Sequence, residues 1–296
     1  MKVLLLTGGN SSERKISLLS AAQVKKALLE NGHSVKIYDL RRGHANIINL
    51  AKDFDILFPV LHGEEGEGGR LHKYLSKLKK PVVGSKNYKG FQAAWYKIPF
   101  KEYCDKNNLP TPKWRIVKNP KDIINFGFPC VVKTSSGGSS REVFILKSKK
   151  ELLSKSRKIF LHKNLFVEDY IQGQEATVGV LNNRALTVIE IIPPDNSWFN
   201  YKNKYSGETK EIVDSKNISP KLKKEMQKIA LKIHCFFNLG SYSRTDFMID
   251  KNKQVYVLEI NTIPGLTAES LLPKETGMPF TEFIQTLVKL SLDKSA

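Results

Sequence analysis

Short, almost continuously apolar runs alternate with helical patterns through the first ninety residues, and this alternation limits the possible folds more than any other feature. The first run, at 2–7, ends in two glycines, as a strand buried on both faces does. The apolar residues of 16–29 then recur at helical spacing. Further strands are expected at 35–38, 56–61 and 81–84, with short helices at 47–51 and 71–78. Parallel strands joined by helices produce this order, so we expect an open, mostly parallel α/β domain over residues 1–90.

The loops after the first and third strands are rich in glycine, and such loops face the ligand in parallel sheets. The first, Gly8-Gly9-Asn-Ser-Ser-Glu13, is not a G-x-G-x-x-G motif, and the chain has no G-x-x-x-x-G-K-[ST], so neither a Rossmann site nor a P-loop is supported. Its backbone N–H groups suit an anion, whereas the Glu13 carboxylate suits a substrate ammonium group. A glutamate that complements the helix dipole is an equally good interpretation. The second loop opens with His62, which ends a buried strand and is a candidate site residue.

Beyond residue 90 the pattern changes to shorter strands in a mixed order. A helix at 90–107 leads to a proline-marked joint at 109–112. Residues 193–214 are polar without a regular period, and a loop of that length is usually a lid or another functional segment. The remaining elements are expected as strands at 114–118, 129–133, 142–147, 165–168, 244–250 and 254–260, a hairpin at 176–192, and helices at 148–158, 219–237 and from Pro279 onward. We expect two further units, at 91–175 and 176–296.

A lysine followed by seven small residues is the strongest local signal. Lys133 ends an apolar strand, and Thr134-Ser-Ser-Gly-Gly-Ser-Ser140 follows it directly. Small residues with exposed amides close over phosphates, and a lysine on a strand supplies a fixed positive charge. A flexible linker is the alternative, although linkers rarely begin directly on a core strand.

Carboxylates near strand ends suggest two further subsites. Glu168, Asp169 and Glu175 offer acceptors for an adenine amino group and a ribose, with a solvated turn as the alternative. Glu259 and Asn261 lie two apart, hence on one face of a strand, and Asp246 would lie across a hairpin from them. Three oxygen ligands with room for water and phosphate suit Mg²⁺ rather than Zn²⁺, whereas an ordinary surface strand would explain the Glu-x-Asn pair alone.

The charge balance is unusual, with 48 Lys+Arg against 29 Asp+Glu and a formal charge of +19. Nucleic-acid binding is its first interpretation. However, the excess is not concentrated in any block, and Lys predominates over the Arg that makes most bidentate contacts to phosphates and guanines. We therefore expect a solvated lysine-rich surface and no nucleic-acid partner. Three widely spaced cysteines, no apolar run long enough to cross a bilayer and no secretory signal indicate a cytoplasmic protein without a membrane partner.

Taken in order, these segments resemble the D-alanine–D-alanine ligase family of ATP-grasp enzymes over nearly the whole chain. The matching segments are Leu6-Thr-Gly-Gly-Asn-Ser-Ser-Glu-Arg14, Leu61-His-Gly with Gly66-Glu67, Val83-Gly84-Ser85, Val132-Lys133 with Gly138-Ser-Ser140, Glu168 with Gly173-Gln-Glu175, Lys204-Tyr205, Arg244-Thr-Asp246, and Glu259-Ile-Asn-Thr-Ile-Pro-Gly265-Leu-Thr-Ala-Glu-Ser-Leu271. The resemblance implies an N-terminal open parallel α/β (pre-ATP-grasp) domain followed by a two-lobed ATP-grasp fold. It also implies ATP-dependent ligation of two D-alanines through an acyl phosphate, for peptidoglycan precursor synthesis, by a homodimer.

The resemblance also assigns roles to residues. Those that would hold ATP are Lys97, Lys133 and Lys204 at the phosphates and Glu168, Asp169, Ile171 and Glu175 around adenine and ribose. Those that would carry two Mg²⁺ ions, with Mn²⁺ as a substitute, are Asp246, Glu259 and Asn261. Those that would meet the substrates are Glu13 and His62 at the first D-alanine, Arg244 and the Gly265 N–H at the tetrahedral oxyanion, and Ser270 and Leu271 at the second carboxylate. Those that would form a hydrogen-bonded triad tying the lid over the site are Glu13, Ser139 and Tyr205.

The chain departs from the family pattern in places, and three alternatives remain open. Arg141-Glu142 stands where the loop usually continues with a glycine, Thr134 replaces a proline, and Gly68 replaces an acid. A different ATP-grasp carboxylate–amine ligase, a catalytically weak nucleotide-binding homologue and a nucleic-acid-binding protein are the alternatives.

Overall fold

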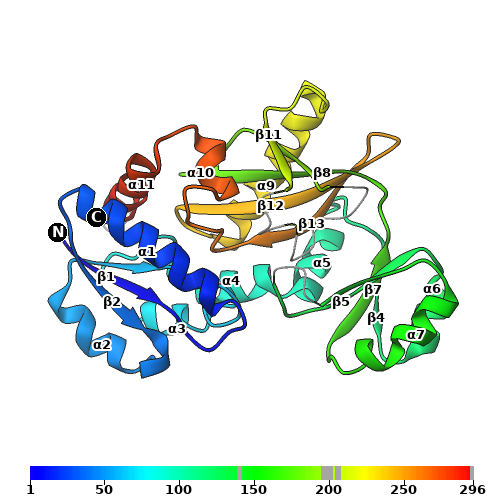
Figure 1. Cartoon of the computed structure of the whole chain (residues 1–296), viewed down its shortest axis with the longest axis horizontal. Helices are drawn as coiled ribbons and strands as arrows, with labels where there is room; N and C mark the ends of the chain where they lie inside the picture. The colour runs from blue at the N-terminus through cyan, green and yellow to red at the C-terminus, as the bar shows by residue number, and fades with distance from the viewer. Residues whose placement is uncertain (139–141, 195–202, 204–207, 294–296) are drawn as a thin grey trace.

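Three β-sheets follow one another along the chain. The computed structural model describes residues 1–138, 142–194, 203 and 208–293. In Figure 1 the sheet of the first strands lies at one end, a four-stranded sheet at the other, and the largest sheet between and above them. This arrangement confirms the expected α/β and α+β fold, a parallel N-terminal part followed by two antiparallel lobes. None of the helices in the described part combines the length and apolar character that a membrane span requires.

The N-terminal sheet is parallel, in the order β2-β1-β3. Strand β1 is buried from its second residue onward, because helices cover both of its faces. The apolar run at 81–84, expected as a further strand, makes only an isolated parallel bridge between Val82 and Leu57. The bounds here are β1 (Lys2–Thr7), α1 (Arg14–Glu30), β2 (Ser34–Asp39), the 3₁₀ turns η1 (Leu40–Arg42) and η2 (Ala51–Asp53), α2 (Asn46–Leu50), β3 (Ile56–Pro59) and α3 (His72–Leu75).

The helix expected at 90–107 is two helices, α4 (Tyr88–Trp95) and α5 (Lys97–Lys106), which meet at an extended Tyr96. The break has a local cause, because Pro99 lies in the first turn of α5 and its ring is incompatible with a helix that continues through the preceding turn. The first backbone N–H groups of α5 bond outside the helix. The Lys97 N–H donates to the Ser135 carbonyl oxygen at 2.8 Å, and the Ile98 N–H donates to the Ser135 hydroxyl at 3.2 Å. The start of α5 is thereby tied to the small-residue loop that follows Lys133.

The four-stranded sheet is antiparallel, in the order β4-β7-β5-β6. Its apolar face packs on two short helices, so this lobe has a core of its own. The bounds are β4 (Trp114–Val117), α6 (Pro120–Phe126), β5 (Cys130–Thr134), β6 (Val143–Leu146), α7 (Lys149–Ile159) and β7 (Leu165–Asp169).

Replacing Asn119 by alanine is expected to lower the free energy of unfolding by about 1 kcal/mol. Asn119 caps α6, because its side-chain oxygen accepts backbone N–H groups of the first turn. The Asp122 carboxylate in turn accepts the Asn119 N–H, so the two residues form a capping box. Asn119→Asp keeps an acceptor oxygen and should remain near wild type in denaturant unfolding. Equal losses in both variants would contradict the capping explanation.

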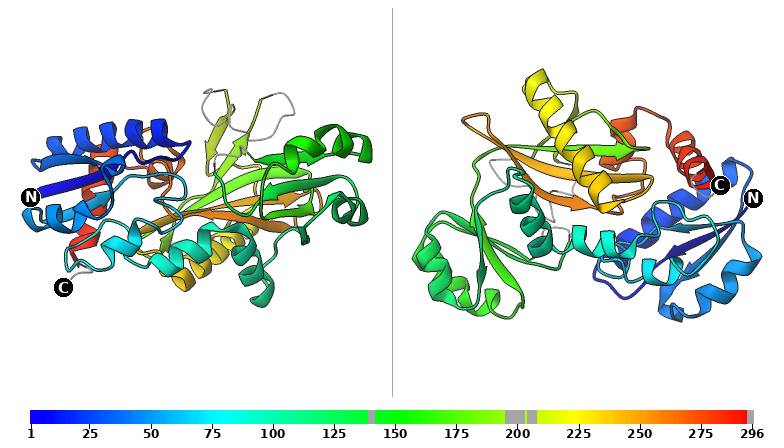
Figure 2. Two further views of the ribbon diagram at one scale, coloured as in Figure 1. Left: turned by 90° about the horizontal axis from the view of Figure 1, so that it is seen from below. Right: turned by 180° about the vertical axis from the view of Figure 1, so that it is seen from behind.

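The largest sheet runs in the order β11-β10-β8-β12-β13, with β9 paired to β8. Helix α9 lies across its back face, as the right-hand view of Figure 2 shows. Two expectations were wrong here: the second arm of the hairpin is split into β9 and β10, and residues 210–213 of the aperiodic segment form an edge strand. The bounds are β8 (Gly173–Leu181), β9 (Arg184–Ala185), β10 (Ile189–Ile192), β11 (Lys210–Val213), α9 (Pro220–Phe237), β12 (Tyr242–Asp250) and β13 (Val255–Asn261).

The C-terminal helices α10 (Leu271–Thr276) and α11 (Phe280–Asp293) return the chain to its beginning. Helix α11 packs along α1, and its apolar residues join one buried cluster with those of β1 (Figure 1). The N-terminal sheet and the largest sheet are therefore held together through shared core. The domain boundaries at 90 and 175 stay predictions.

Candidate active site

Two of the cavities in the described part of the chain are lined by most of the predicted site residues. The first, of about 710 Å³, lies between the four-stranded sheet and the front of the largest sheet. The second, of about 540 Å³, lies between the largest sheet and the N-terminal loops. Both volumes are ordinary for small-molecule sites. Lys97 and Glu259 line both cavities, so the two meet at this pair.

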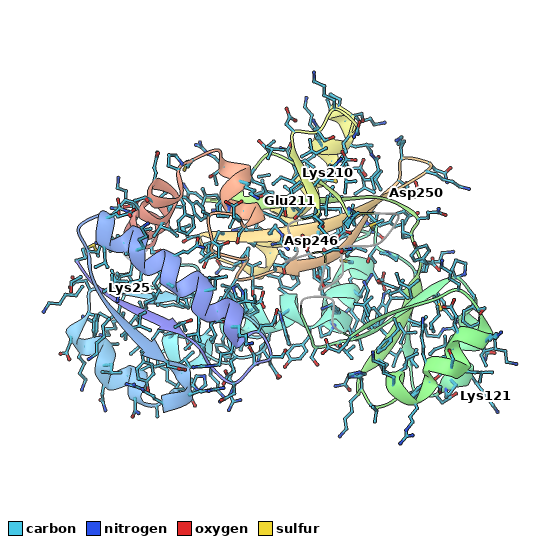
Figure 3. The ribbon with its side chains drawn as sticks, viewed as in Figure 1. Lys25, Lys121, Lys210, Glu211, Asp246 and Asp250 are labelled. Carbon is cyan, nitrogen blue, oxygen red and sulfur yellow. The ribbon has the colours of Figure 1, made fainter. Side chains whose placement is uncertain are left out.

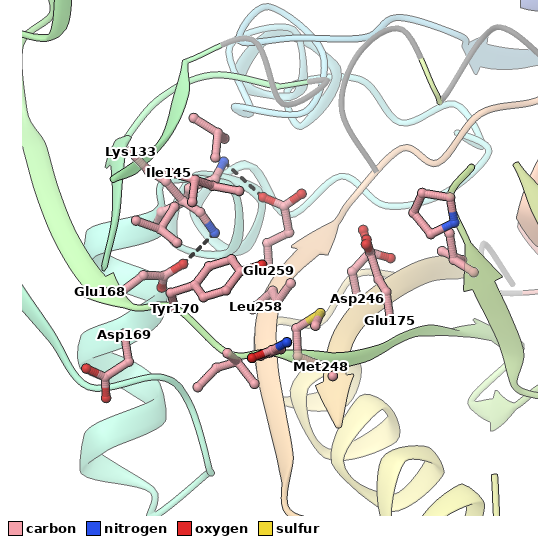
Figure 4. Close-up of a pocket in the computed structure, with 18 of the residues that line it drawn as sticks. Lys133, Ile145, Glu168, Asp169, Tyr170, Glu175, Asp246, Met248, Leu258 and Glu259 are labelled. Atoms are coloured by element: carbon pink, nitrogen blue, oxygen red, sulfur yellow. Dashed lines mark ion pairs between the residues drawn. The ribbon is translucent and has the colours of Figure 1, made fainter. Parts of the chain in front are cut away.

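An ion pair marks this junction, because Lys97 Nζ lies 3.1 Å from Glu259 Oε2 (Figure 4). Lys97 Nζ also donates to the Gly137 carbonyl oxygen at 2.8 Å. One ammonium group thus joins the start of α5, the small-residue loop and the end of β13.

The carboxylate of Asp246 is the most fully bonded group of the site. Arg244 donates to both of its oxygens, at 2.9 and 3.0 Å. The Thr177 hydroxyl donates to it at 2.7 Å, and the Asn261 amide at 2.9 Å. The β-ladder explains this meeting, because Asp246 is paired with Thr177 and Glu259, and Arg244 with Asn261. The pairing of Asp246 with Glu259 is the one that the sequence pattern predicts.

A bulge between β12 and β13 shapes the wall of the first cavity. The register passes from Asp246–Glu259 to Phe247–Val257, which leaves Leu258 as the extra residue. Bulges re-aim side chains, and here the consecutive residues Leu258 and Glu259 both line the cavity (Figure 4). Strict alternation would have turned one of them toward the core.

The donors at this wall fit a hard cation in chemical type. Asp246, Glu259 and Asn261 offer two carboxylates and an amide oxygen, the ligands that Mg²⁺ prefers. In the structure cationic side chains occupy both carboxylates, Arg244 at Asp246 and Lys97 at Glu259. Among the described residues no group of three His, Cys, Asp or Glu side chains is arranged around a metal position.

Glu168 lies at the floor of the first cavity between two lysines. Its carboxylate oxygens lie 2.5 Å from Lys133 Nζ and 2.5 Å from Lys101 Nζ. Burial alone would raise the pKa of Glu168, but the two ammonium groups hold it below its usual range. The side chain is therefore an ionised acceptor at neutral pH. Lys133 and Glu168 face the same space in Figure 4.

The structure brings most of the predicted nucleotide residues to the first cavity. Its lining includes Lys97, Lys133, Glu168, Asp169, Ile171, Glu175, Asp246 and Glu259. Lys204, Ser139 and Tyr205 lie outside the described residues. The ligand assigned to each residue stays a prediction.

Glu13 precedes α1 and is buried, with 7% of its surface exposed. It lines the second cavity and makes no side-chain capping hydrogen bond, although its position at the N-terminus of α1 is compatible with the helix-dipole interpretation as well. A Cβ on Gly138 would lie 2.7 Å from Glu13 Oε2. A larger residue at 138 would therefore displace the Glu13 carboxylate from its present position.

The remaining predicted substrate residues also line the second cavity. His62 is buried, its Nε2 lies 3.4 Å from the Ser20 hydroxyl, and burial lowers its pKa. Ser270 holds the turn before α10, since the Thr267 N–H donates to its hydroxyl at 3.1 Å. A Cβ on Gly265 would lie 2.7 Å from that hydroxyl, so a side chain at this position would crowd Ser270. The members of this set are Glu13, His62, Arg244, Gly265, Ser270 and Leu271, and the predicted metal ligand Asn261 lines the same cavity.

Glu67 is a buried carboxyl of the second cavity that belongs to a matching segment but to which the sequence analysis assigned no role. It accepts the Gly63 N–H at 2.8 Å. Burial, reinforced by the nearby Glu13 carboxylate, raises the pKa of Glu67 to about 8. Glu67 therefore holds a proton at neutral pH. In this neutral form it avoids charge repulsion with the nearby carboxylates of Glu13 and Glu259.

Glu67→Gln is expected to flatten the pH dependence of stability between pH 6 and 7.5. The unfolded chain loses this proton near 4.5 and the folded chain near 8, so stability falls as pH rises between the two values. At about 1.4 kcal/mol per pH unit, the wild type should lose about 2 kcal/mol more than the variant. Urea unfolding of both proteins at pH 6 and at pH 7.5 measures this difference in stability. Glu64→Gln, on the exposed side of the loop, should keep the wild-type slope, and a wild-type slope in Glu67→Gln would refute the assignment.

Three more buried charged residues near the cavities had no assigned role. Lys101 is paired with Glu168, Glu190 accepts the Gln174 amide at 2.9 Å, and burial raises the pKa of Glu275 beside Arg244. The available signal for Lys101 was its position among the apolar residues Phe100 and Cys104. Glu190 likewise lies in an apolar run, between Ile189 and Ile191, whereas no comparable apolar run surrounds Glu275.

Comparisons with known proteins agree with this geometry. A family model described as D-ala D-ala ligase C-terminus matches residues 105–289. A D-alanine–D-alanine ligase of Maridesulfovibrio salexigens is 36% identical, with 99% of each chain covered, and one of Aquifex aeolicus is 36% identical over 97% of this chain and all of its own. Among solved structures, a Bacillus anthracis D-alanine–D-alanine ligase complexed with ATP has a TM-score of 0.85 at 28% identity, over 100% of this chain and 98% of that one. With more than half of the chain matched by the family model and its full length by these relatives, the chain belongs to the D-alanine–D-alanine ligase family.

Proposed function

We propose that this chain joins two D-alanine molecules into D-alanyl-D-alanine at the expense of ATP, in the cytoplasm, as a step of peptidoglycan precursor synthesis. The observation that carries the proposal is the junction of the two cavities at Lys97 and Glu259. A nucleotide in the first cavity would present its terminal phosphate there, and an amino acid in the second would present its carboxylate. The family membership supports the same assignment.

In the first step a carboxylate oxygen of one D-alanine attacks the terminal phosphorus of ATP. The bond to ADP breaks, and an acyl phosphate forms. Glu13 holds the ammonium group of this D-alanine, and Lys97 and Lys133 hold the phosphates, with Lys204 as a third cation. Burial of the site between the sheets keeps water from the acyl phosphate.

In the second step the amine of another D-alanine attacks the acyl carbon, loses a proton, and expels phosphate. Negative charge develops on the acyl oxygen, and Arg244 with the Gly265 N–H stabilises it. Ser270 and Leu271 orient the second carboxylate, and His62 lies beside the first substrate. Ser139 and Tyr205 would complete a hydrogen-bonded triad with Glu13.

Two Mg²⁺ ions would be held by Asp246, Glu259 and Asn261, and when bound they neutralise phosphate charge. Lys97 and Arg244, which are paired with two of these carboxylates in the structure, are also the residues proposed to contact the substrates. Lys97 leaves Glu259 for phosphate, and Arg244 leaves Asp246 for the developing oxyanion. A homodimer is the proposed assembly.

Phosphate release from ATP and Mg²⁺ in the presence of single amino acids and pairs tests the function. D-alanine alone should support release, with formation of the dipeptide, and L-alanine should not. Lys133→Ala is the inactive control, because it removes a cation from the first cavity. Release no higher than this control on every amino acid would exclude the ligase, and the weak nucleotide-binding homologue would then be left.

A second acceptor amino acid is a specific alternative. A structure of the VanG D-Ala:D-Ser ligase from Enterococcus faecalis covers 98% of this chain with a TM-score of 0.80 at 25% identity, so the fold accommodates either acceptor. Adding D-serine to a D-alanine reaction and identifying the dipeptide decides between them.

A further inference from the structure

Lys101 is a fully buried lysine that lies behind Glu168 at the floor of the first cavity. Its surface is 1% exposed, and it does not line the cavity. Its ammonium group lies 2.5 Å from Glu168 Oε2 and donates to the Thr111 hydroxyl at 2.7 Å. Thr111 donates in turn to the Val257 carbonyl oxygen at 2.9 Å. Lys101 is thus tied to the four-stranded sheet and, through Thr111, to the largest sheet.

The two lysines beside Glu168 differ in what else they can reach. Lys133 lines the cavity and is free to turn toward an anion bound there, whereas Lys101 has no access to that space. A buried carboxylate that loses its partner becomes an uncompensated charge. Lys101 therefore keeps Glu168 ionised whichever group Lys133 contacts.

An ionised carboxylate only accepts hydrogen bonds. Glu168 consequently favours an amino group at the cavity floor and disfavours a carbonyl oxygen there. The surrounding wall suits a flat heterocycle, because apolar side chains approach from both lobes (Figure 4). They are Val131, Ile145, Ile171, Met248 and Leu258.

We propose that Lys101 is a positioning residue that sets the nucleobase preference of this protein, by holding Glu168 as an acceptor for the 6-amino group of adenine. The inference rests on the proposed ATP-dependent function, but it concerns nucleotide binding and requires no amino-acid substrate. Lys101 itself touches neither nucleotide nor reacting atoms.

The test is the ratio of dissociation constants for ATP and ITP, measured by calorimetry with Mg²⁺ and without amino acid. ITP carries an oxygen where ATP carries the 6-amino group. Wild type should bind ATP more tightly, and Lys101→Met should lower this preference about tenfold or more, by weakening ATP rather than ITP. Lys101→Arg keeps a cation and should recover part of the preference. Lys106→Met, on the exposed end of the same helix, should leave the ratio unchanged.

Several results would overturn the proposal: no preference for ATP in the wild type, an unchanged ratio in Lys101→Met, or equal weakening of both nucleotides. If Lys101→Met does not fold, Glu168→Gln decides, because an amide that donates to the ITP oxygen should abolish or reverse the preference. A wild type that binds ATP selectively but forms no dipeptide refutes the proposed function, whereas the ratio still decides the role of Lys101.

Discussion

Arg244→Lys should lower kcat for D-alanine-dependent phosphate release by about 10²–10³, the usual effect of losing one oxyanion donor. Arg244 is 9% exposed and lines the second cavity near Gly265. Its planar group donates two bonds to Asp246, and that fork positions it in the absence of substrate. Lysine keeps the charge but cannot reproduce the fork.

Arg184→Lys is the matched control, since Arg184 is exposed on β9, and its kcat should be unchanged. Thermal unfolding of Arg244→Lys separates a catalytic loss from a folding loss, because the retained cation still compensates Asp246. A kcat within about threefold of wild type in a folded Arg244→Lys would remove Arg244 from the stabilisation of the oxyanion.

Each cation of the site is paired with an acid, so four cations and three acids together contribute little to the net charge of the chain. Lys97 is paired with Glu259, Lys133 and Lys101 with Glu168, and Arg244 with Asp246. When a nucleotide and its metal cations bind at such a site, the phosphates become the partners of the lysines, and the metal cations become the partners of the carboxylates. The excess of +19 lies elsewhere.

Lysines occur on elements of all three sheet units. Figure 3 places Lys25 on α1, Lys121 on α6 and Lys210 on β11, in separate parts of the molecule, with Asp246 near the centre. This distribution agrees with a solvated lysine-rich surface.

Much of the fold could be predicted because each signal was local. Continuous apolar runs identified the strands of the N-terminal sheet, and the Glu-x-Asn spacing placed Glu259 and Asn261 on one face. The break at Tyr96 has a signal in Pro99, which the expected helix at 90–107 did not take into account. The bonds from α5 to Ser135 could not be predicted, because Ser135 is remote in sequence. The bulge at Leu258 likewise follows from pairing with β12 rather than from the sequence of β13.

The buried charges escaped prediction for a related physical reason. A lysine or glutamate is stable in a core only beside a partner, and that partner is generally remote in sequence. Lys101 and Glu168 stabilise each other from α5 and β7, and Glu67 is buried by the loop around Gly63. Single-sequence patterns record the charge but not the partner.

Asp246→Asn is expected to lower kcat by at least about 10²–10³ and to abolish the added thermal stabilisation that Mg²⁺ confers in the presence of ATP. It should also destabilise the folded chain by about 3–5 kcal/mol, because Arg244 loses its buried counter-charge. The amide introduced by this substitution also cannot accept hydrogen bonds from all the groups that now donate to Asp246. Its nitrogen would face one of these donors: the Arg244 guanidinium, the Thr177 hydroxyl or the Asn261 amide.

Thr177→Val provides the matched comparison, because it removes one donor to Asp246 and leaves the carboxylate in place. Its cost in stability should be about 1 kcal/mol, and its Mg²⁺-dependent stabilisation should persist. Melting curves with ATP alone and with ATP and Mg²⁺ distinguish the two variants. Full Mg²⁺-dependent stabilisation in Asp246→Asn would mean that other residues hold the cation. Binding of Mg²⁺ would then not explain why Arg244 leaves Asp246 for the substrate.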